Sequence, residues 1–324
     1  MSQDHSLHPP AHRFAMLAAL GIGGVIAVQS RINGELGHRL NDGIFAAVIS
    51  FSVSITILLV IIAFRPSTRE HLTVDLPREY RAGRLKWWQL LGGLGGATFV
   101  ASQALTVSVL GVALFTVAIV AATTSSSLLV DRLGLSPGGK RAITAPRIIG
   151  AVGATLAVAL AVSGRFSEGN LAIWALAVSV IAGIASSFQQ AFNAQVSVAT
   201  RDPLVATLVN FLAGFTALVT ALLIEHSIGH REWHLPPAPW EQPILWLGGP
   251  VGLLFIVTAA YFVAPLGVLL FSLLNIAGQL VGALILDLII PTPGTVVDVS
   301  LVVGMFLTLA AVAVASYRPR VSKQ

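Results

Sequence analysis

The 324-residue sequence contains no cysteine, and only 10% of its residues are charged. Without cysteine the chain can form neither disulfide bonds nor thiolate metal sites, and cysteine usage gives no indication of the redox compartment. A soluble domain carries charge on about a quarter of its residues, whereas 55% of this chain is hydrophobic. Uncharged runs such as 87–130 and 242–286 therefore exclude a soluble protein and indicate one embedded in a lipid bilayer.

Several functional motifs are also missing. The basic residues lie in short segments between apolar runs, without the extended basic patch and interleaved aromatics of a nucleic-acid-binding protein. No glycine-rich phosphate loop is present, so ATP is not the direct energy source. An intramembrane enzyme would need His, Asp or Glu clustered at one membrane depth, and the sequence has no such cluster. We therefore expect no catalytic residues, no metal, no cofactor and no nucleic-acid partner.

The apolar runs, separated by polar residues, glycine or proline, predict an all-α integral membrane protein with ten transmembrane helices. Breaks at Leu110-Gly111 and Pro265-Leu266-Gly267 divide each of the two long uncharged runs into a helical hairpin. The predicted spans are 14–33, 44–64, 87–108, 111–130, 147–164, 171–199, 203–224, 243–263, 266–287 and 296–317.

The basic residues predict the orientation of these helices. Of the 19 lysines and arginines, all but Arg31, Arg39, Arg165 and Arg231 fall on one side of the predicted membrane. Positive residues are retained in the cytoplasm. The tails 1–13 and 318–324 are therefore predicted to be cytoplasmic, in a multi-pass membrane protein.

An internal repeat divides the chain into two similar halves. A shift of 160 residues superimposes polar and glycine positions of the first helices, and a shift of 156 does so for the later ones. The matched pairs are Gly23 with Gly183, Gln29 with Gln189, Asn33 with Asn193, Asp42 with Asp202, Phe51 with Phe211, Gly92 with Gly248, Gly96 with Gly252, Phe99 with Phe255, Leu110-Gly111 with Leu266-Gly267, and Asp131 with Asp287.

The repeat sets the expected domain organisation, with one five-helix unit at 14–164, a linker at 165–170 and a second unit at 171–317. Because five is odd, a second copy in tandem must enter the membrane from the opposite side. The sequence therefore predicts two inverted five-helix repeats, an arrangement that recurs in secondary transporters.

Three stretches of the sequence resemble a known family. They are Ala27-Val28-Gln29 to Asn33-Gly34-Glu35-Leu36-Gly37, then Ala47 to Phe51, and Gly278-Gln279-Leu280 to Leu286-Asp287. They are similar to the YdcZ-like branch of the bacterial drug/metabolite transporter superfamily, whose members are often single five-helix units. The resemblance implies a fused pair in the bacterial inner membrane, with a central cavity between the halves. One departure is that Gly278-Gln279 aligns with Ala122-Thr123 of the first half, so the halves are not expected to be equivalent in function.

Intramembrane amides are the candidate substrate-binding residues. Gln29 and Asn33 are four residues apart and share a helix face, and Gln189 and Asn193 repeat that face. Asn275 and Gln279 form a third pair. Amides can hydrogen-bond a polar solute without charge, but they also join helices, at roughly 0.6–2 kcal/mol per bond. Both roles stay open at this point.

Charged residues in the membrane usually mark function. Glu35 lies two residues beyond Asn33 and its repeat mate is Gln195, so a titratable group is present in one half only. A coupling role for Glu35 competes with a solvated helix end. Asp131 and Asp287 close their predicted helices, where an anchoring role is favoured over proton transfer.

The sequence favours a secondary transporter that exports small polar metabolites or drug-like compounds by alternating access. Its expected partners are a small-molecule substrate and the lipid bilayer, and a homodimer stays open. The alternative is a lipid-flipping or membrane-assembly protein that does not transport small solutes. The sequence identifies neither the substrate, the direction of transport nor a coupling ion.

Overall fold

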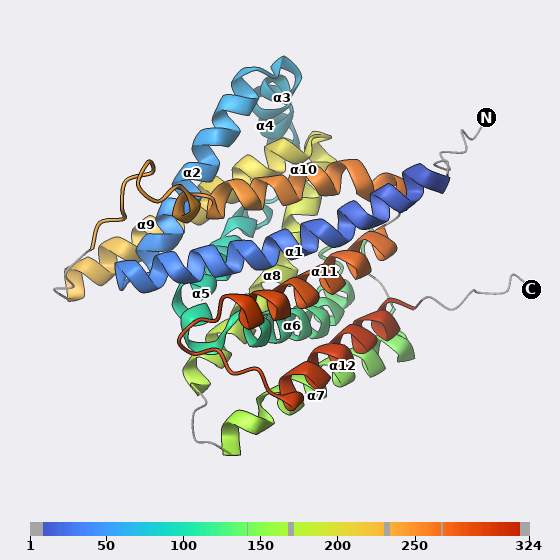
Figure 1. Ribbon diagram of the computed structural model, residues 1–324. Coiled ribbons are helices and arrows are strands. Elements are labelled where there is room, and N and C mark those ends of the chain that lie inside the picture. The colour runs from blue at the N-terminus through green and yellow to red at the C-terminus, as the bar shows by residue number, and fades with distance from the viewer. Residues whose placement is uncertain (1–8, 141, 168–171, 230–233, 267, 318–324) are drawn as a thin grey trace, which may run out of the picture.

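The computed structural model describes residues 9–140, 142–167, 172–229, 234–266 and 268–317 (Figure 1). The expected tails therefore lie largely outside the described residues, as does most of the expected linker. Every regular element within the described ranges is helical. Among the residues it describes, nine helices are long and apolar enough to cross a membrane, which agrees with an integral membrane protein.

Ten long helices make up the bundle within these ranges. They are α1 Pro9–Leu40, α2 Gly43–Ala63, α5 Gly93–Leu110, α6 Val112–Leu133, α7 Ala145–Ser167, α8 Ile173–Thr200, α9 Pro203–Ile228, α10 Gly248–Leu266, α11 Val268–Ile289 and α12 Val299–Ser316. α10 is the long helix that is not among the nine candidate spans, and it corresponds to the expected span at 243–263.

The first residue of α1 and the last of α12 lie at the same end of the bundle (Figure 1). We call this the terminus end and the opposite one the far end. The expected break between α5 and α6 is present at Gly111, whose φ of +80° is a conformation that favours glycine. The chain therefore reverses in a single residue, as the predicted hairpin requires.

The segment between α2 and α5, expected to be a loop, is partly helical. It contains α3 Pro66–Glu70, the π-helical turn η1 His71–Asp75, α4 Leu76–Arg81 and the 3₁₀ helix η2 Trp87–Gly92. Prolines lie in the first turns of α3 and α4, where the missing N–H costs nothing. Hydrogen bonds from Arg84 hold the pKa of Glu79 below its usual range, so this basic segment is internally paired in part. Hydropathy alone does not detect such short polar helices.

Equivalent helices of the two halves pack against each other in three pairs, α2 with α9, α6 with α11, and α7 with α12. The α7/α12 pair forms one edge of the bundle in Figure 1. Its interface contains small residues, with Gly150 against the backbone of Ala311 and Gly304 against Ala157 and Ala161. Small residues allow close helix contact in lipid, where apolar burial does not drive association.

Contacts made by one half recur with the equivalent residues exchanged. A Cβ atom added at Gly248 would lie 2.2 Å from Asn33 Oδ1, and one at Gly92 would lie 2.6 Å from Asn193 Oδ1. Two further contacts have counterparts of the same kind. The contact of Gly252 with Gln29 corresponds to that of Gly96 with Gln189, and the contact of Gly23 with the Asn275 carbonyl corresponds to that of Gly183 with the Ile119 carbonyl. The matched glycines thus receive the side chains and backbone of the opposite half.

Phe51 and Phe211, which are repeat mates, contact each other directly. Their ring centroids are 5.0 Å apart and the rings are inclined at 68°, an edge-to-face geometry that aromatic rings favour. A residue contacts its own repeat mate where both lie next to the axis of the operation that superimposes one half on the other. This axis therefore passes between α2 and α9.

Candidate functional site

A central cavity of about 1220 Å³ lies between the two halves. Both halves contribute to its walls, which include residues of α1, α2, α5 and α6 on one side of the repeat and of α8 to α12 on the other. Transporter sites with internal repeats are typically built at such an interface. The cavity is thus the leading candidate for a functional site.

One wall carries an amide cluster on α8 and α9. Gln189 Nε2 and Asn193 Nδ2 each donate to Asn210 Oδ1 at 3.0 Å. Gln189 and Asn193 are one helical turn apart, so both side chains reach the same acceptor. Asn210 therefore fixes both amides. No hydrogen bond within the described residues uses the side-chain oxygens, Gln189 Oε1 and Asn193 Oδ1.

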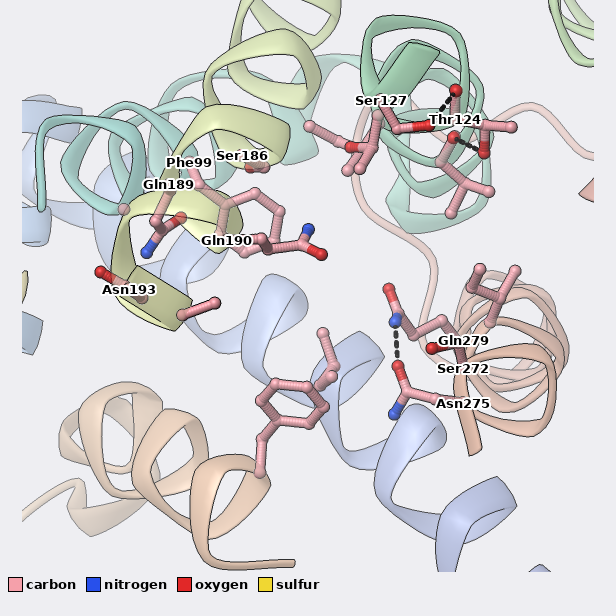
Figure 2. Close-up of a pocket in the computed structure, with 18 of the residues that line it drawn as sticks. Phe99, Thr124, Ser127, Ser186, Gln189, Gln190, Asn193, Ser272, Asn275 and Gln279 are labelled. Carbon is pink, nitrogen blue, oxygen red and sulfur yellow. Dashed lines mark hydrogen bonds between the residues drawn. The ribbon is translucent and has the colours of Figure 1, made fainter. Parts of the chain in front are cut away.

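The facing wall carries Asn275 and Gln279 on α11. Gln279 Nε2 donates to Asn275 Oδ1 at 2.6 Å, while the buried Asn275 Nδ2 has no hydrogen-bond partner. Figure 2 shows Ser272 beside this pair and Gln190 of α8 extending into the space between the two walls. Uncharged hydrogen-bonding groups therefore face the cavity from two sides.

The rest of the lining is mostly apolar or hydroxylated, and includes Phe99, Phe255 and Phe271. The charged residues of the described lining are Asp131 and Arg147, which form an ion pair with each other. They lie where α6 ends and α7 begins, at the terminus end, together with Tyr317 after α12. The cavity thus reaches the terminus end, and its interior carries no unpaired formal charge among the described lining residues.

A buried polar network bounds the cavity toward the far end. Asn33 Nδ2 donates to Gln103 Oε1 at 2.7 Å, Gln103 Nε2 donates to Ser30 Oγ at 2.8 Å, and Ser50 Oγ donates to Asn33 Oδ1 at 2.7 Å. Asn33 is 1% exposed and Gln103 is fully buried. The repeat mate of Gln103 is Ala259, so only the first half can form this network.

A second seal at the far end is formed by Asp287, the last acidic residue of α11. Its Oδ1 and Oδ2 accept hydrogen bonds from the backbone N–H groups of Val112 and Ala113 at 2.9 and 2.7 Å. These N–H groups belong to the first turn of α6 and lack partners within their own helix. The following loop is fixed as well, since Gly294 N donates to the Ser108 carbonyl at 2.9 Å.

Asp131, the repeat mate of Asp287, has different partners. It lies at the terminus end and binds Arg147, with Ser136 Oγ at 3.5 Å. One end of the bundle is therefore closed by an aspartate on a helix N-terminus, while at the other end the equivalent aspartate lies at the cavity lining. Both positions agree with the anchoring role expected at helix ends.

Five of the six amides predicted from the sequence line the cavity: Gln29, Gln189, Asn193, Asn275 and Gln279. Asn33 does not, because the buried network encloses it. Glu35 also lies outside the lining and is ion-paired with Arg31 at 3.2 Å and Arg39 at 2.6 Å, which gives its expected coupling role no support.

Sequence reasoning missed several lining residues. Gln190 adjoins Gln189, but its mate Ser30 carries no amide, so the repeat did not mark it. Phe99 and Ser272 are ordinary residues for a membrane helix, and only their position reveals them. Asn210 has Ser50 as its repeat mate, so the repeat did not mark the matching contacts of Asn210 with Asn193 and of Ser50 with Asn33. No cluster of metal-binding side chains occurs in the described part of the chain.

Comparison with known proteins bears directly on this architecture. The family model described as "Putative inner membrane exporter, YdcZ" matches the chain twice, over residues 14–160 and 174–314. No curated protein matches the chain. One solved crystal structure matches over 95% of this chain and 98% of its own, with a TM-score of 0.54 and 14% identity. That likeness shows a shared fold, and the double match confirms the resemblance to a two-copy exporter.

Proposed function

Since the chain belongs to the YdcZ family of inner membrane exporters, a transporter family rather than an enzyme family, we propose that it is a secondary transporter exporting small polar metabolites or drug-like compounds by alternating access. The observation that carries this proposal is the cavity of about 1220 Å³ between the halves, lined by amides from both. A solute of several tens of atoms can occupy this volume, and the amides can bind its polar groups without charge.

The proposed mechanism uses ten spans arranged as two inverted repeats. The matched glycine contacts and the Phe51–Phe211 contact support this relation between the halves. If exchanging the two halves converts one state into the other, Asn33 takes the position that Asn193 has here, and Asp131 the position of Asp287. Asn33 then belongs to the same binding site as Asn193, but in the state that opens at the far end.

With both termini in the cytoplasm, the cavity described here opens inward. This is the state in which an exporter loads its solute. The closed far end, sealed by Gln103 and Asp287, then separates the solute from the outside until the halves rearrange.

Reconstitution into proteoliposomes with a metabolite panel, with and without a pH gradient, tests the proposal. We expect protein-dependent flux of at least one small polar solute, which substitution of Gln189 by Leu would reduce. A fluorescent-lipid assay on the same vesicles tests the alternative function. Lipid movement without flux of any solute would contradict the transporter proposal.

A further inference from the structure

The hydrogen-bonding atoms that the cavity walls leave unused indicate what a solute can bind. On the α8 wall, Gln189 and Asn193 each donate one N–H to Asn210 Oδ1. Each NH₂ group keeps one further N–H, and no described hydrogen bond uses the side-chain oxygens. Asn193 Oδ1 packs against Gly92, so Gln189 Oε1 is the acceptor left for a solute. This wall therefore offers an acceptor, Gln189 Oε1, to an N–H or O–H donor of a solute.

The α11 wall carries an unused acceptor, Gln279 Oε1, and an unused donor, Asn275 Nδ2. Asn275 is 5% exposed, its Oδ1 is occupied by Gln279, and its Nδ2 donor has no partner. In Figure 2 this nitrogen points away from Gln279. A buried donor without a partner is costly, so an acceptor oxygen placed there by a solute would recover that cost. Because this atom is buried, the Asn275 side chain must rotate to present the N–H to the cavity.

Between the two walls the lining is aromatic and carries no unpaired charge. Phe99, Phe255 and Phe271 line the cavity, and Asp131 and Arg147 neutralise each other at the terminus end. An ion in this interior would lose hydration without gaining a counter-charge. An apolar or planar section, in contrast, gains contact with the rings.

From these three observations we infer the substrate class: net-neutral solutes with an N–H or O–H donor at one end, a carbonyl oxygen at the other and an apolar or aromatic section between them. The donor binds the α8 wall, the oxygen binds Asn275, and the middle packs on the phenylalanines. This inference rests on the proposed function and specifies what the cavity accepts.

A matched series of aromatic probes tests the class by calorimetry on the full-length protein in detergent. 4-Aminoacetophenone has the donor, the ring and the carbonyl and is neutral at pH 7. 4-Aminobenzoate is its anionic counterpart, and 4-acetyl-N,N,N-trimethylanilinium is its cationic one. Acetophenone lacks the donor and aniline lacks the carbonyl. We expect 4-aminoacetophenone to bind at least tenfold more tightly than either ion and several-fold more tightly than the two truncated probes.

Variants connect this preference to Asn275. Asn275→Leu removes the donor and is expected to weaken binding of 4-aminoacetophenone about fivefold while leaving aniline unchanged. Asn275→Ser keeps an O–H donor and should recover part of the loss, which shows that the effect is not a folding defect. Gln242→Leu, a loop amide that lies outside the cavity lining, is the control that leaves binding unchanged.

The outcomes separate this inference from the proposed function. Equal or tighter binding of an ion, or an Asn275→Leu variant that binds like the parent, overturns the inference and leaves the transporter intact. Flux of other solutes in proteoliposomes without binding of the probe also overturns the inference and leaves the transporter proposal intact. Absence of both binding and flux of any solute contradicts the proposed function and the inference together.

Discussion

Asn33 and Asn193 are repeat mates in different surroundings. Asn193 lines the cavity and makes one side-chain hydrogen bond, whereas Asn33 makes two in a closed network. We expect Asn193→Ala to slow transport roughly 3- to 10-fold with an unchanged melting temperature. Asn33→Ala should lower the melting temperature, by about 2–4 °C for each kcal/mol lost. Flux and thermal unfolding measured on both variants check this. Equal losses of stability would contradict the assignment.

Gln103 joins α5 to α1 near the far end through a side chain that the second half lacks. Gln103→Ala makes this position match Ala259 and removes two buried hydrogen bonds, worth about 1–2 kcal/mol together in a membrane. The population open at the far end should therefore rise roughly 5- to 30-fold. A cysteine at the fully buried Val107 reports this as faster reaction with an impermeant maleimide.

The control for this experiment lies at the terminus end. Gln195 donates to the Leu135 carbonyl there, so Gln195→Ala removes an amide of the same type from the opposite end. It should not accelerate labelling at position 107. Acceleration by both variants would show general loosening of the bundle and would contradict a specific role for Gln103.

The contact between α11 and the first turn of α6 leads to a prediction at the scale of helices. Both carboxylate oxygens of Asp287 accept backbone N–H groups of α6. Asp287→Asn leaves one oxygen and places an NH₂ group against an N–H donor, which leaves a buried N–H unsatisfied at a cost of about 1–3 kcal/mol. The far end should open more often, and labelling of a cysteine at Val107 should again accelerate.

Asp298 provides the matched control for Asp287. It caps α12 at the same end by accepting from Leu301 N at 2.7 Å. Asparagine serves equally well at such a position. Asp298→Asn should therefore leave the labelling rate unchanged, and an equal response of the two variants would exclude a gating role for Asp287.

The positions of the helices followed largely from hydropathy, but their ends did not. α9 begins at Pro203, where it was expected, whereas α1 runs from Pro9 to Leu40 against an expected 14–33. An apolar run records what lies in lipid, and a helix continues beyond it until a residue such as Asn41, with a φ of +52°, ends it. Polar helices such as α4 carry no such signal.

The candidate site was predictable for a related reason and to a limited extent. Spacing of four residues places Gln29 with Asn33, and Gln189 with Asn193, on common faces. Spacing cannot tell which face is enclosed. That depends on Gln103, 70 positions from Asn33 in the chain, and on the matched glycines. Pairing between distant helices therefore decides which amides face the cavity.

The orientation of the whole molecule gives a prediction that the absence of cysteine makes simple to test. Both termini should be cytoplasmic, because the basic residues concentrate on that side. In intact cells, a cysteine at Pro239, in the loop before α10, should react with an impermeant maleimide. One at Ser67 in α3 should react only after lysis. The reverse pattern would contradict the orientation.

The missing charge inside the cavity also determines what can drive the solute. Carrying one elementary charge across a membrane yields or costs about 2.3 kcal/mol per 100 mV. The walls described here hold Asp131 and Arg147 as a neutral pair, and a net-neutral cargo adds nothing. A carrier that moved such a solute alone would draw no work from the membrane voltage, and its net flow would follow the concentration ratio of the solute. Such a carrier would relieve accumulation inside the cell, and concentrating the solute outside would require a co-transported ion.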